Sequence, residues 1–432
     1  MAKSLLAIKL LPKRLNSLVE PVLIFILAAS PLLFGSIRPF HVVVMESATA
    51  LLLFTWLAVS LKKGYFQFIT VPGALPVLAF IAYLFAQYVY ANGLLYGVYL
   101  PGEAYRYKMK EELLKVIMYA VLFYAVLNNF FYRRRLKRLI YALVFIGFCL
   151  ALLGLIQKLS GAQKIFWVSP LPEGKNRDFF SSFPSRDHFA NYMNMLIFIT
   201  LGFIFSRLPL LREAVKGFDK ASISKGIALA FTHKIWLFTF ALIIMASAVF
   251  YSLCRGAIIS FFLALLFFSV LVVATGLTKR GNIVLISVII FTAMMLVWVK
   301  APEQINERFS KGLGTDTRFS HMIFKERRVF MDTTIEMIKT YPVFGIGTGA
   351  FEFVYDKNFK PKGFLQKNYV NHAHNDILEF ISEAGLFGTA MFLLVSGFYI
   401  FFFVRIFSKR HDPLAVGVGI GASAAMLSML LH

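Results

Sequence analysis

The chain is poor in charge, and especially in acidic residues. Only 16% of its 432 residues are charged, and 22 Asp and Glu stand against 45 Lys and Arg, for a formal net charge of +23. It has two cysteines, Cys149 and Cys254, both in or beside apolar segments, so neither a disulfide framework nor a cysteine metal cluster is indicated. We find no internal repeats and no low-complexity tail.

Apolar residues dominate instead. They make up 59% of the chain, and the mean hydropathy is +0.71. Many windows of about 18 to 22 residues carry almost no charge, which is the length of a helix that crosses a bilayer. The composition predicts an all-α, polytopic integral membrane protein, and we count about 11 transmembrane helices.

The hydropathy pattern divides the chain into three regions. We expect nine spans in residues 1–300, an outer segment at 301–376, and the last spans in 377–432. The basic start has no small-residue cleavage pattern near it, so the first helix is expected to be retained. The final apolar stretch reaches His432, which indicates a truncated natural sequence or a span that ends at the outer face. The expected spans are roughly 19–36, 41–61, 72–91, 113–131, 139–158, 188–206, 235–253, 256–277, 283–300, 377–404 and 414–431.

The short basic clusters predict the orientation. With residue 1 in the cytoplasm, all of them fall in inward loops, as the positive-inside bias requires. The excess positive charge is thereby explained, and nucleic acid is not expected as a partner. The clusters lie at Lys62-Lys63, residues 133–138, residues 207–234, Lys279-Arg280 and Lys409-Arg410.

The outer segment at 301–376 is too long for a simple connector. It contains an amphipathic helix, expected from Phe330 to Lys339 and ended by Tyr341-Pro342. The glycine-rich turn Gly345–Gly349 follows; it lacks the spacing and the strand–helix context of a dinucleotide fingerprint. A phosphate cradle is the alternative function for this turn.

The stretch from Asn371 to Asp376 is where this polar segment becomes a membrane helix. Two imidazoles, His372 and His374, stand at the start of the helix, and Asn375 or Asp376 can cap it. Further along, two glycines one turn apart would allow another helix to pack closely. A catalytic histidine at the bilayer surface and a plain helix cap are equally good interpretations of this stretch alone.

Arginines gather on the outer side without a matching set of acids. Each has a structural alternative, such as snorkelling for Arg38, a local pair with Asp187 for Arg186, and a solvated helix face for Arg327 and Arg328. Arg255 lies between two apolar spans with no acid beside it. Guanidinium groups bind phosphate oxygens bidentately and stay charged. A membrane-embedded diphosphate is therefore the expected ligand.

Four segments resemble a known family, in the right order. His374-Asn375, nine residues and then Gly385-Leu386-Phe387-Gly388-Thr389 resemble the signature of bacterial O-antigen ligases, whose superfamily includes O-antigen polymerases and some protein O-oligosaccharyltransferases. The segments 186–192, 252–256 and 341–347 look like three further motifs of that family. The chain departs from them at Asp187, where Asn is usual, and at Cys254, where Ser is frequent.

The resemblance implies about 12 transmembrane helices and a GT-C-like glycosyltransferase of the bacterial inner membrane that works at the periplasmic face without metal or cofactor. It implies transfer of a glycan from undecaprenyl diphosphate to the hydroxyl of a glycolipid or glycan acceptor, with the membrane lipids as surroundings. His374 would be the base. The main diphosphate contacts would be Arg186 and Arg327, then Arg255, with Arg328 as the substitute for Arg327. Supporting roles fall to His372, Asn375, His188 and Arg38.

Other functions remain open at this point. We favour an O-antigen ligase, which transfers to lipid A–core, over a repeat-unit polymerase. A transporter predicts inverted repeats and ionisable residues in mid-span, which we do not find. A membrane scaffold would not need a lone arginine in a tight outer turn. The enzyme hypothesis requires the arginines to converge beneath the imidazole of His374.

Overall fold

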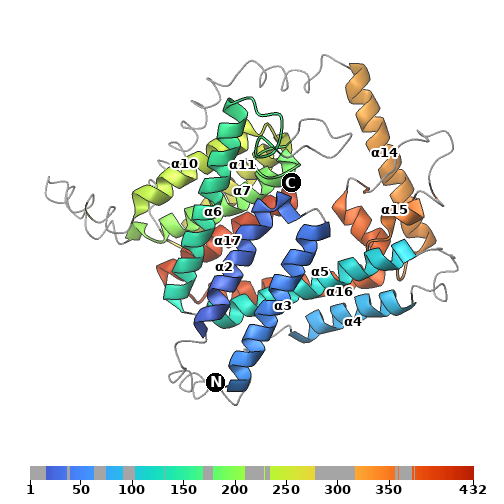
Figure 1. Cartoon of the computed structure of the whole chain (residues 1–432), viewed down its shortest axis with the longest axis horizontal. Helices are drawn as coiled ribbons and strands as arrows, with labels where there is room; N and C mark the ends of the chain where they lie inside the picture. The colour runs from blue at the N-terminus through green and yellow to red at the C-terminus, as the bar shows by residue number, and fades with distance from the viewer. Residues whose placement is uncertain are drawn as a thin grey trace. The chain divides into compact units, whose positions relative to one another are not determined.

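The chain is all-α in a computed structural model. Helices are the regular secondary structure of the part it describes, apart from an isolated bridge between Phe180 and Phe183 (Figure 1). Two compact units are formed. Unit 1 comprises Met1–Ala48, Asn129–Asn306 and Ile406–His432, and unit 2 comprises Thr49–Asn128 and Glu307–Arg405. The described residues are 16–36, 39–62, 74–90, 103–130, 132–168, 179–209, 228, 234–277, 317–355, 359, 372–373 and 375–432.

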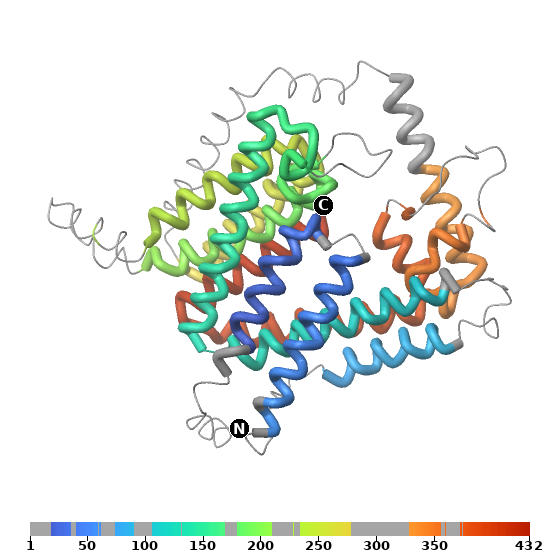
Figure 2. Tube along the Cα trace, viewed as in Figure 1, coloured from blue at the N-terminus to red at the C-terminus, as the bar shows by residue number. Residues whose placement is uncertain are grey.

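Unit 1 is built around helix α7, Arg186–Phe205, which is buried along most of its length. Four other helices pack against α7, and α2 packs against α6. Segments from the start, the middle and the end of the chain therefore share one core (Figure 2). The other helices of the unit are α2 (Asn16–Leu32), α6 (Arg133–Leu159), α10 (Ile235–Tyr251), α11 (Arg255–Ala274) and α17 (Pro413–Leu431).

The backbones of α7 and α17 touch. A Cβ placed on Gly202 would lie 2.2 Å from the carbonyl oxygen of Gly417, and one on Gly417 would lie 2.4 Å from the carbonyl oxygen of Gly202. Small residues at such crossings let membrane helices approach and gain dispersion contacts. Asn194 of α7 also donates to the carbonyl oxygen of Ala257 in α11, at 2.9 Å. This bond joins α7 to the first turn of α11.

Unit 2 has its own core, in which residues from the outer segment meet α5. Met109 of α5, Met337 of α14 and Ala373 are all buried in it. The helices of this unit are α4 (Ala74–Tyr90), α5 (Glu103–Asn129), α14 (Thr317–Thr340), α15 (Phe351–Val354) and most of α16 (Asp376–Phe407), and α3 (Pro39–Lys62) runs from unit 1 into it.

Six of the described helices are long and apolar enough to cross a membrane, so the chain is a multi-pass membrane protein. Three shorter apolar helices accompany them. The predicted span at 283–300 lies outside the described residues, and the total of about 11 to 12 spans stays a prediction. One predicted helix boundary was wrong, because α14 begins at Thr317 rather than at Phe330. The predicted span at 113–131 overlaps α5, which begins earlier, at Glu103. Both helices extend through polar residues, which hydropathy cannot assign to a helix.

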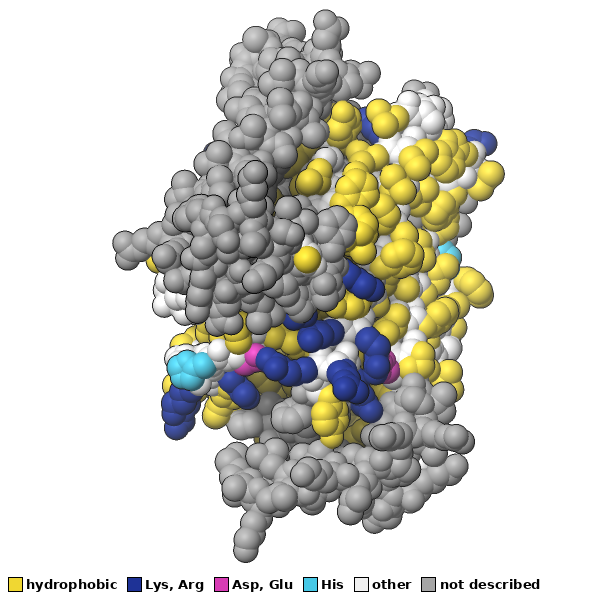
Figure 3. Space-filling view, turned by 90° about the vertical axis from the view of Figure 1, so that its left-hand side faces the viewer, with side chains coloured by type: hydrophobic (Ala, Val, Ile, Leu, Met, Phe, Trp, Pro, Cys, Tyr) yellow, Lys and Arg dark blue, Asp and Glu magenta, His cyan; other side chains and the backbone are white. Residues whose placement is uncertain are grey.

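Basic side chains gather at one end of unit 1. Arg133 at the start of α6 forms an ion pair with Asp412, which precedes α17. Arg138 donates two hydrogen bonds, of 2.5 and 2.6 Å, to the carboxylate of Glu20 in α2. Lys and Arg side chains form a band on the face seen in Figure 3, beside a broad apolar surface. The basic clusters at residues 133–138 and at Lys409-Arg410, which the sequence assigns to inward loops, thus lie at the same end of the unit, as the predicted topology requires.

Candidate functional site

Helix α16 breaks at Gly385, inside the signature segment. Gly385 has φ 67° and ψ 176°, a conformation open essentially to glycine alone. The chain that follows α14 lies against this break and exchanges four backbone hydrogen bonds with it. They run from the N–H groups of Ile346, Gly347, Leu386 and Phe387 to the carbonyl oxygens of Ser382, Glu383, Pro342 and Val343, at 2.8–3.0 Å. Two of the segments that resemble the family, 341–347 and 385–389, therefore form one structural element.

Glycine is required on both sides of this contact. A Cβ on Gly345 would lie 2.4 Å from the backbone nitrogen of Gly385, and a Cβ on Gly385 would lie 2.3 Å from that of Gly345. Gly388, one turn further on, faces the ring of Tyr83 in α4. The sequence predicts a close helix contact at these glycines. It forms at Gly388, whereas Gly385 meets the glycine-rich turn.

Two side chains of α4 donate hydrogen bonds to carbonyl groups on both sides of this contact. The hydroxyl of Tyr83 donates to the carbonyl oxygen of Ala384 at 2.6 Å. The side-chain amide of Gln87, which is buried, donates to the carbonyl oxygens of Phe344 at 2.7 Å and Glu383 at 3.2 Å. A buried carbonyl group left without a hydrogen-bond donor makes folding less favourable. Helix α4 thereby stabilises the broken helix.

Replacing Tyr83 by phenylalanine should lower the free energy of unfolding by about 1–3 kcal/mol, because a carbonyl in an apolar setting loses its donor while the ring contacts remain. Thermal unfolding of the detergent-purified protein measures this. The exposed Tyr107 of α5 offers the matched control, since Tyr107→Phe should leave Tm unchanged. Equal Tm values for Tyr83→Phe and wild type would contradict the role given to this hydroxyl.

The glycine-rich turn is already occupied by a carboxylate of the chain. Oε1 of Glu383 accepts a hydrogen bond from the backbone N–H of Phe351 at 3.1 Å, and its carboxylate also accepts from the N–H of Gly349. The N–H of Gly347 donates to the backbone oxygen of Glu383. These amides are the groups that a phosphate cradle would use. The cradle alternative for Gly345–Gly349 is therefore not supported.

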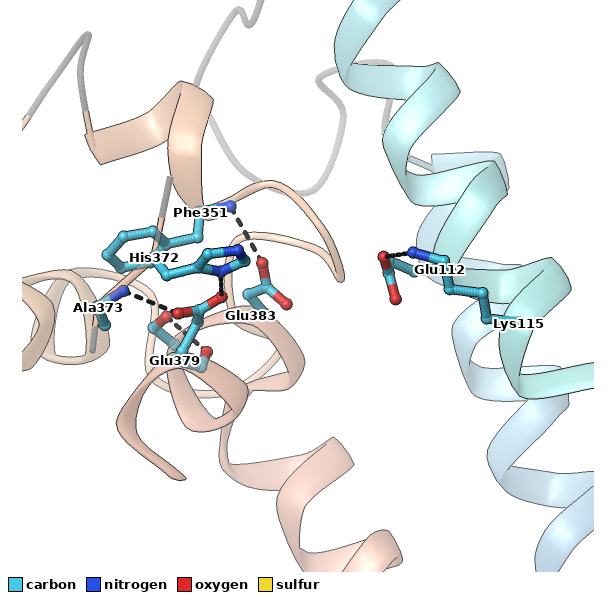
Figure 4. Close-up of polar contacts among 8 residues, drawn as sticks. Glu112, Lys115, Phe351, His372, Ala373, Glu379 and Glu383 are labelled. Atoms are coloured by element: carbon cyan, nitrogen blue, oxygen red, sulfur yellow. Dashed lines mark hydrogen bonds and ion pairs between the residues drawn. The ribbon is translucent and has the colours of Figure 1, made fainter. Parts of the chain in front are cut away.

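The segment before α16 is held by Glu379 (Figure 4). Nδ1 of His372 and Oε1 of Glu379 are 2.8 Å apart, and Oε2 accepts from the N–H of Ala373 at 2.8 Å. Oδ1 of Asn375 accepts from the N–H of Leu378 at 3.1 Å, which confirms the predicted cap. The residues on either side of position 374 are thus anchored. His374 itself lies outside the described residues.

The hydrogen bond to Glu379 raises the pKa of His372, and the charges of Glu379, Glu383 and Glu352 act in the same direction. Protonation of His372 is therefore easier in the folded protein than in the unfolded chain. The ion pair adds stability below the unfolded pKa of about 6.5, and this contribution is lost as the pH rises through the raised pKa.

Glu379 and Glu383 are the residues that sequence reasoning missed. They are spaced four apart, so both fall on one face of α16, towards the segments before the helix (Figure 4). The sequence did contain a signal for these two residues. Placing two acidic side chains at the start of an apolar helix costs free energy unless they have partners.

A second group of predicted residues lies at one end of unit 1. Arg186 begins α7 and pairs with Asp187, with Nε and Oδ1 3.8 Å apart. Arg255 begins α11 and is exposed, directly after Cys254, whose Sγ accepts from the N–H of Ala257 at 3.4 Å. Burial raises the pKa of Cys254 to about 12, with a further contribution from the neighbouring Asp187. The N-termini of α7 and α11, each with an arginine, are therefore neighbours.

This end of unit 1 lies opposite the basic end. Arg207 follows the C-terminus of α7 and is near Arg133, whereas Arg186 is at the N-terminus of the same helix. A helix of 20 residues is about 30 Å long. Arg186 and Arg255 thus lie on the side that the predicted topology makes the outer one.

The remaining predicted residues are placed as follows. Arg328 is exposed on α14 in unit 2, Arg327 precedes it in the same helix, and His188 is exposed in the first turn of α7. Arg38 lies outside the described residues. Arg186 and Arg255 begin neighbouring helices of unit 1, whereas the His372–Asn375 segment and α14 belong to unit 2. Within the described ranges, no three His, Cys, Asp or Glu side chains are arranged to hold a metal ion.

Unit 2 also contains an apolar cavity of about 420 Å³ between α3, α4 and α5. Its lining is hydrocarbon apart from the indole of Trp56 and the phenol of Tyr124. The volume is in the range of ligand pockets. A cavity of this size and lining suits a hydrocarbon chain.

No curated protein matches the chain. Residues 240–393 match the model of a family described as O-antigen ligase. The matched region contains Arg255, α14, the His372–Asn375 segment and the break at Gly385. This match supports placing the chain in the superfamily of O-antigen ligases and O-antigen polymerases.

Proposed function

We propose that this membrane protein is a metal-independent glycosyltransferase. It moves a glycan from undecaprenyl diphosphate to an acceptor hydroxyl at the periplasmic face of the bacterial inner membrane. The acceptor we propose is lipid A–core, which makes the enzyme an O-antigen ligase, in keeping with the description of the matching family.

The observation that carries this proposal is the anchored imidazole segment at the mouth of α16. Glu379 holds His372 and Ala373, and Asn375 caps the helix. His374 lies between these fixed residues in the sequence, where an apolar helix begins. A histidine with an ordinary pKa near 6.5 can accept a proton from a hydroxyl at neutral pH. We assign the role of general base to His374.

We assign the diphosphate contacts to Arg186, Arg327 and Arg255, with Arg328 in place of Arg327 as the alternative. Arg186 and Arg255 stand at neighbouring helix N-termini, where the helix dipoles also favour an anion. Arg328, the alternative to Arg327, is exposed on α14.

The reaction is a single displacement. The acceptor oxygen attacks the anomeric carbon, the bond from that carbon to the diphosphate oxygen breaks, and the hydroxyl proton passes to His374. The diphosphate leaves with the bonding electron pair, and guanidinium groups stabilise the charge that develops on it. Such a displacement inverts the anomeric centre, which NMR of the product linkage can test.

The decisive experiment is to incubate purified protein with an undecaprenyl-diphosphate oligosaccharide and candidate acceptors, and to follow mass. We expect lipid A–core to gain one glycan. A ladder of longer lipid-linked glycans would identify a repeat-unit polymerase instead. Absence of transfer to every acceptor, including a second donor molecule, would reject a glycosyltransferase.

Replacing Arg186 by lysine should weaken turnover of the lipid-linked donor by about tenfold or more. Lysine keeps the charge but cannot form the bidentate contact. The measurement is kcat/KM for the donor. Arg134→Lys is the matched control, because Arg134 is exposed at the basic end of unit 1, and it should keep wild-type kinetics. Unchanged kinetics in Arg186→Lys would leave Arg186 with a structural role only.

A further inference from the structure

His372 has one ring nitrogen engaged and the other available. Nδ1 is bonded to Oε1 of Glu379, at 2.8 Å. Among the described residues, Nε2 has no hydrogen-bond partner. The side chain of His372 is 73% exposed, whereas that of Glu379 is only 17% exposed. The ring is therefore fixed through Nδ1, and its Nε2 side is accessible to a ligand.

The anchoring defines the chemistry of the ring. Glu379 also accepts from the N–H of Ala373, so one carboxylate holds both the imidazole and the backbone beside it (Figure 4). An ionised carboxylate only accepts, so the proton on Nδ1 is directed to it. In the neutral ring, Nε2 is then a hydrogen-bond acceptor. This is the carboxylate–imidazole arrangement that suits contact with a hydroxyl group.

The charges around His372 select against an anionic ligand. The carboxylates of Glu379 and Glu352 both act on the ring electrostatically. Carboxylates near the ring repel a diphosphate, whereas they are compatible with the uncharged hydroxyl groups of a sugar. The acceptor, and not the charged part of the donor, is therefore the substrate that fits this position.

We propose that His372 binds the acceptor glycan, through a hydrogen bond between Nε2 and a sugar hydroxyl, with Glu379 as its positioning residue. This inference rests on the proposed transferase function and adds the acceptor side to it. It separates the two histidines of the segment: His374 takes the proton of the reacting hydroxyl, and His372 holds the acceptor sugar.

The test is His372→Asn. The asparagine amide can donate to Glu379 in place of Nδ1, but it has no group at the position of Nε2, so the anchoring is kept and the ligand contact is removed. We expect KM for lipid A–core to rise about tenfold or more, with KM for the undecaprenyl-diphosphate oligosaccharide and Tm unchanged. An unchanged acceptor KM, or an equal rise in both KM values, would overturn the proposal. His411→Asn, an exposed histidine at the basic end of unit 1, is the control and should match wild type.

Glu379→Gln tests the positioning role. A glutamine replaces one of the two carboxylate oxygens by an NH2 group, which donates and cannot accept, so one of the contacts with Nδ1 of His372 and the N–H of Ala373 is lost. The KM of the Glu379→Gln variant for lipid A–core should rise as it does in His372→Asn. Wild-type values for this variant would remove the role given to Glu379.

Binding of core oligosaccharide without donor, measured by isothermal titration, makes the test independent of turnover. We expect His372→Asn to bind it about tenfold more weakly than wild type. Equal binding, or no binding by wild type, would overturn the inference. A wild-type protein that binds the oligosaccharide but transfers no glycan would instead reject the proposed function.

Discussion

Replacing His374 by alanine should leave a folded protein that has lost nearly all glycan transfer. A general base contributes roughly 10²–10⁴-fold to the rate, and alanine has no group that can take the hydroxyl proton. Glu379 and Asn375 hold their partners on either side of this position independently of the side chain at 374. The effect should therefore appear in kcat and not in Tm.

The control for this prediction is His411→Ala. His411 is exposed in the turn before α17 in unit 1, and its loss should not change transfer. If purified His374→Ala transferred glycan at the wild-type rate, another residue would have to be the general base, and His372 would be the first alternative. Loss of both kcat and Tm would show that the residue is needed for folding.

The second large effect is expected at Gly385, where alanine should destabilise the protein by about 2–6 kcal/mol. Its φ of 67° and ψ of 176° are strained for any residue with a Cβ. The added methyl group would also lie 2.3 Å from the backbone nitrogen of Gly345 and 2.4 Å from the carbonyl oxygen of Val343. Backbone atoms cannot move aside as a flexible side chain can, so the turn would separate from the helix. Thermal unfolding in detergent measures the loss.

Helix α16 offers its own control. Gly397→Ala places a methyl group at a position with nothing within 4 Å, so it should be neutral or slightly stabilising. Gly345→Ala should repeat the effect of Gly385→Ala, because each glycine approaches the backbone of the other. A Gly385→Ala protein as stable as Gly397→Ala would mean that the break in α16 is not part of the folded state.

The site could be predicted in part. The pattern of Asn375 followed by apolar residues at helical spacing predicts the start of α16, and the side chain of Asn375 caps it as expected. The contacts of Glu379 with His372 and Ala373 could not be predicted, because they depend on how the preceding segment folds back onto the helix. The break at Gly385 could not be predicted either, because helical periodicity places this residue in an unbroken helix.

The fold, like the site, could be predicted from the sequence only in part. Hydropathy places most helices close to their observed bounds, such as α7 at Arg186–Phe205 and α17 at Pro413–Leu431. It fails at the polar start of α5, where Glu103 begins a helix well before the apolar stretch.

The sequence by itself determined the all-α membrane class, and it supplied the residues that we propose for diphosphate binding and proton transfer. It could do so because crossing a bilayer requires long apolar helices, and because binding and proton transfer are properties of individual side chains. Only the tertiary structure decided that 341–347 joins the break at Gly385, that α4 supplies its donors, and that Glu379 orients His372. These contacts join residues that are far apart along the chain or that meet across a turn, and their geometry is set by packing, which no local pattern encodes.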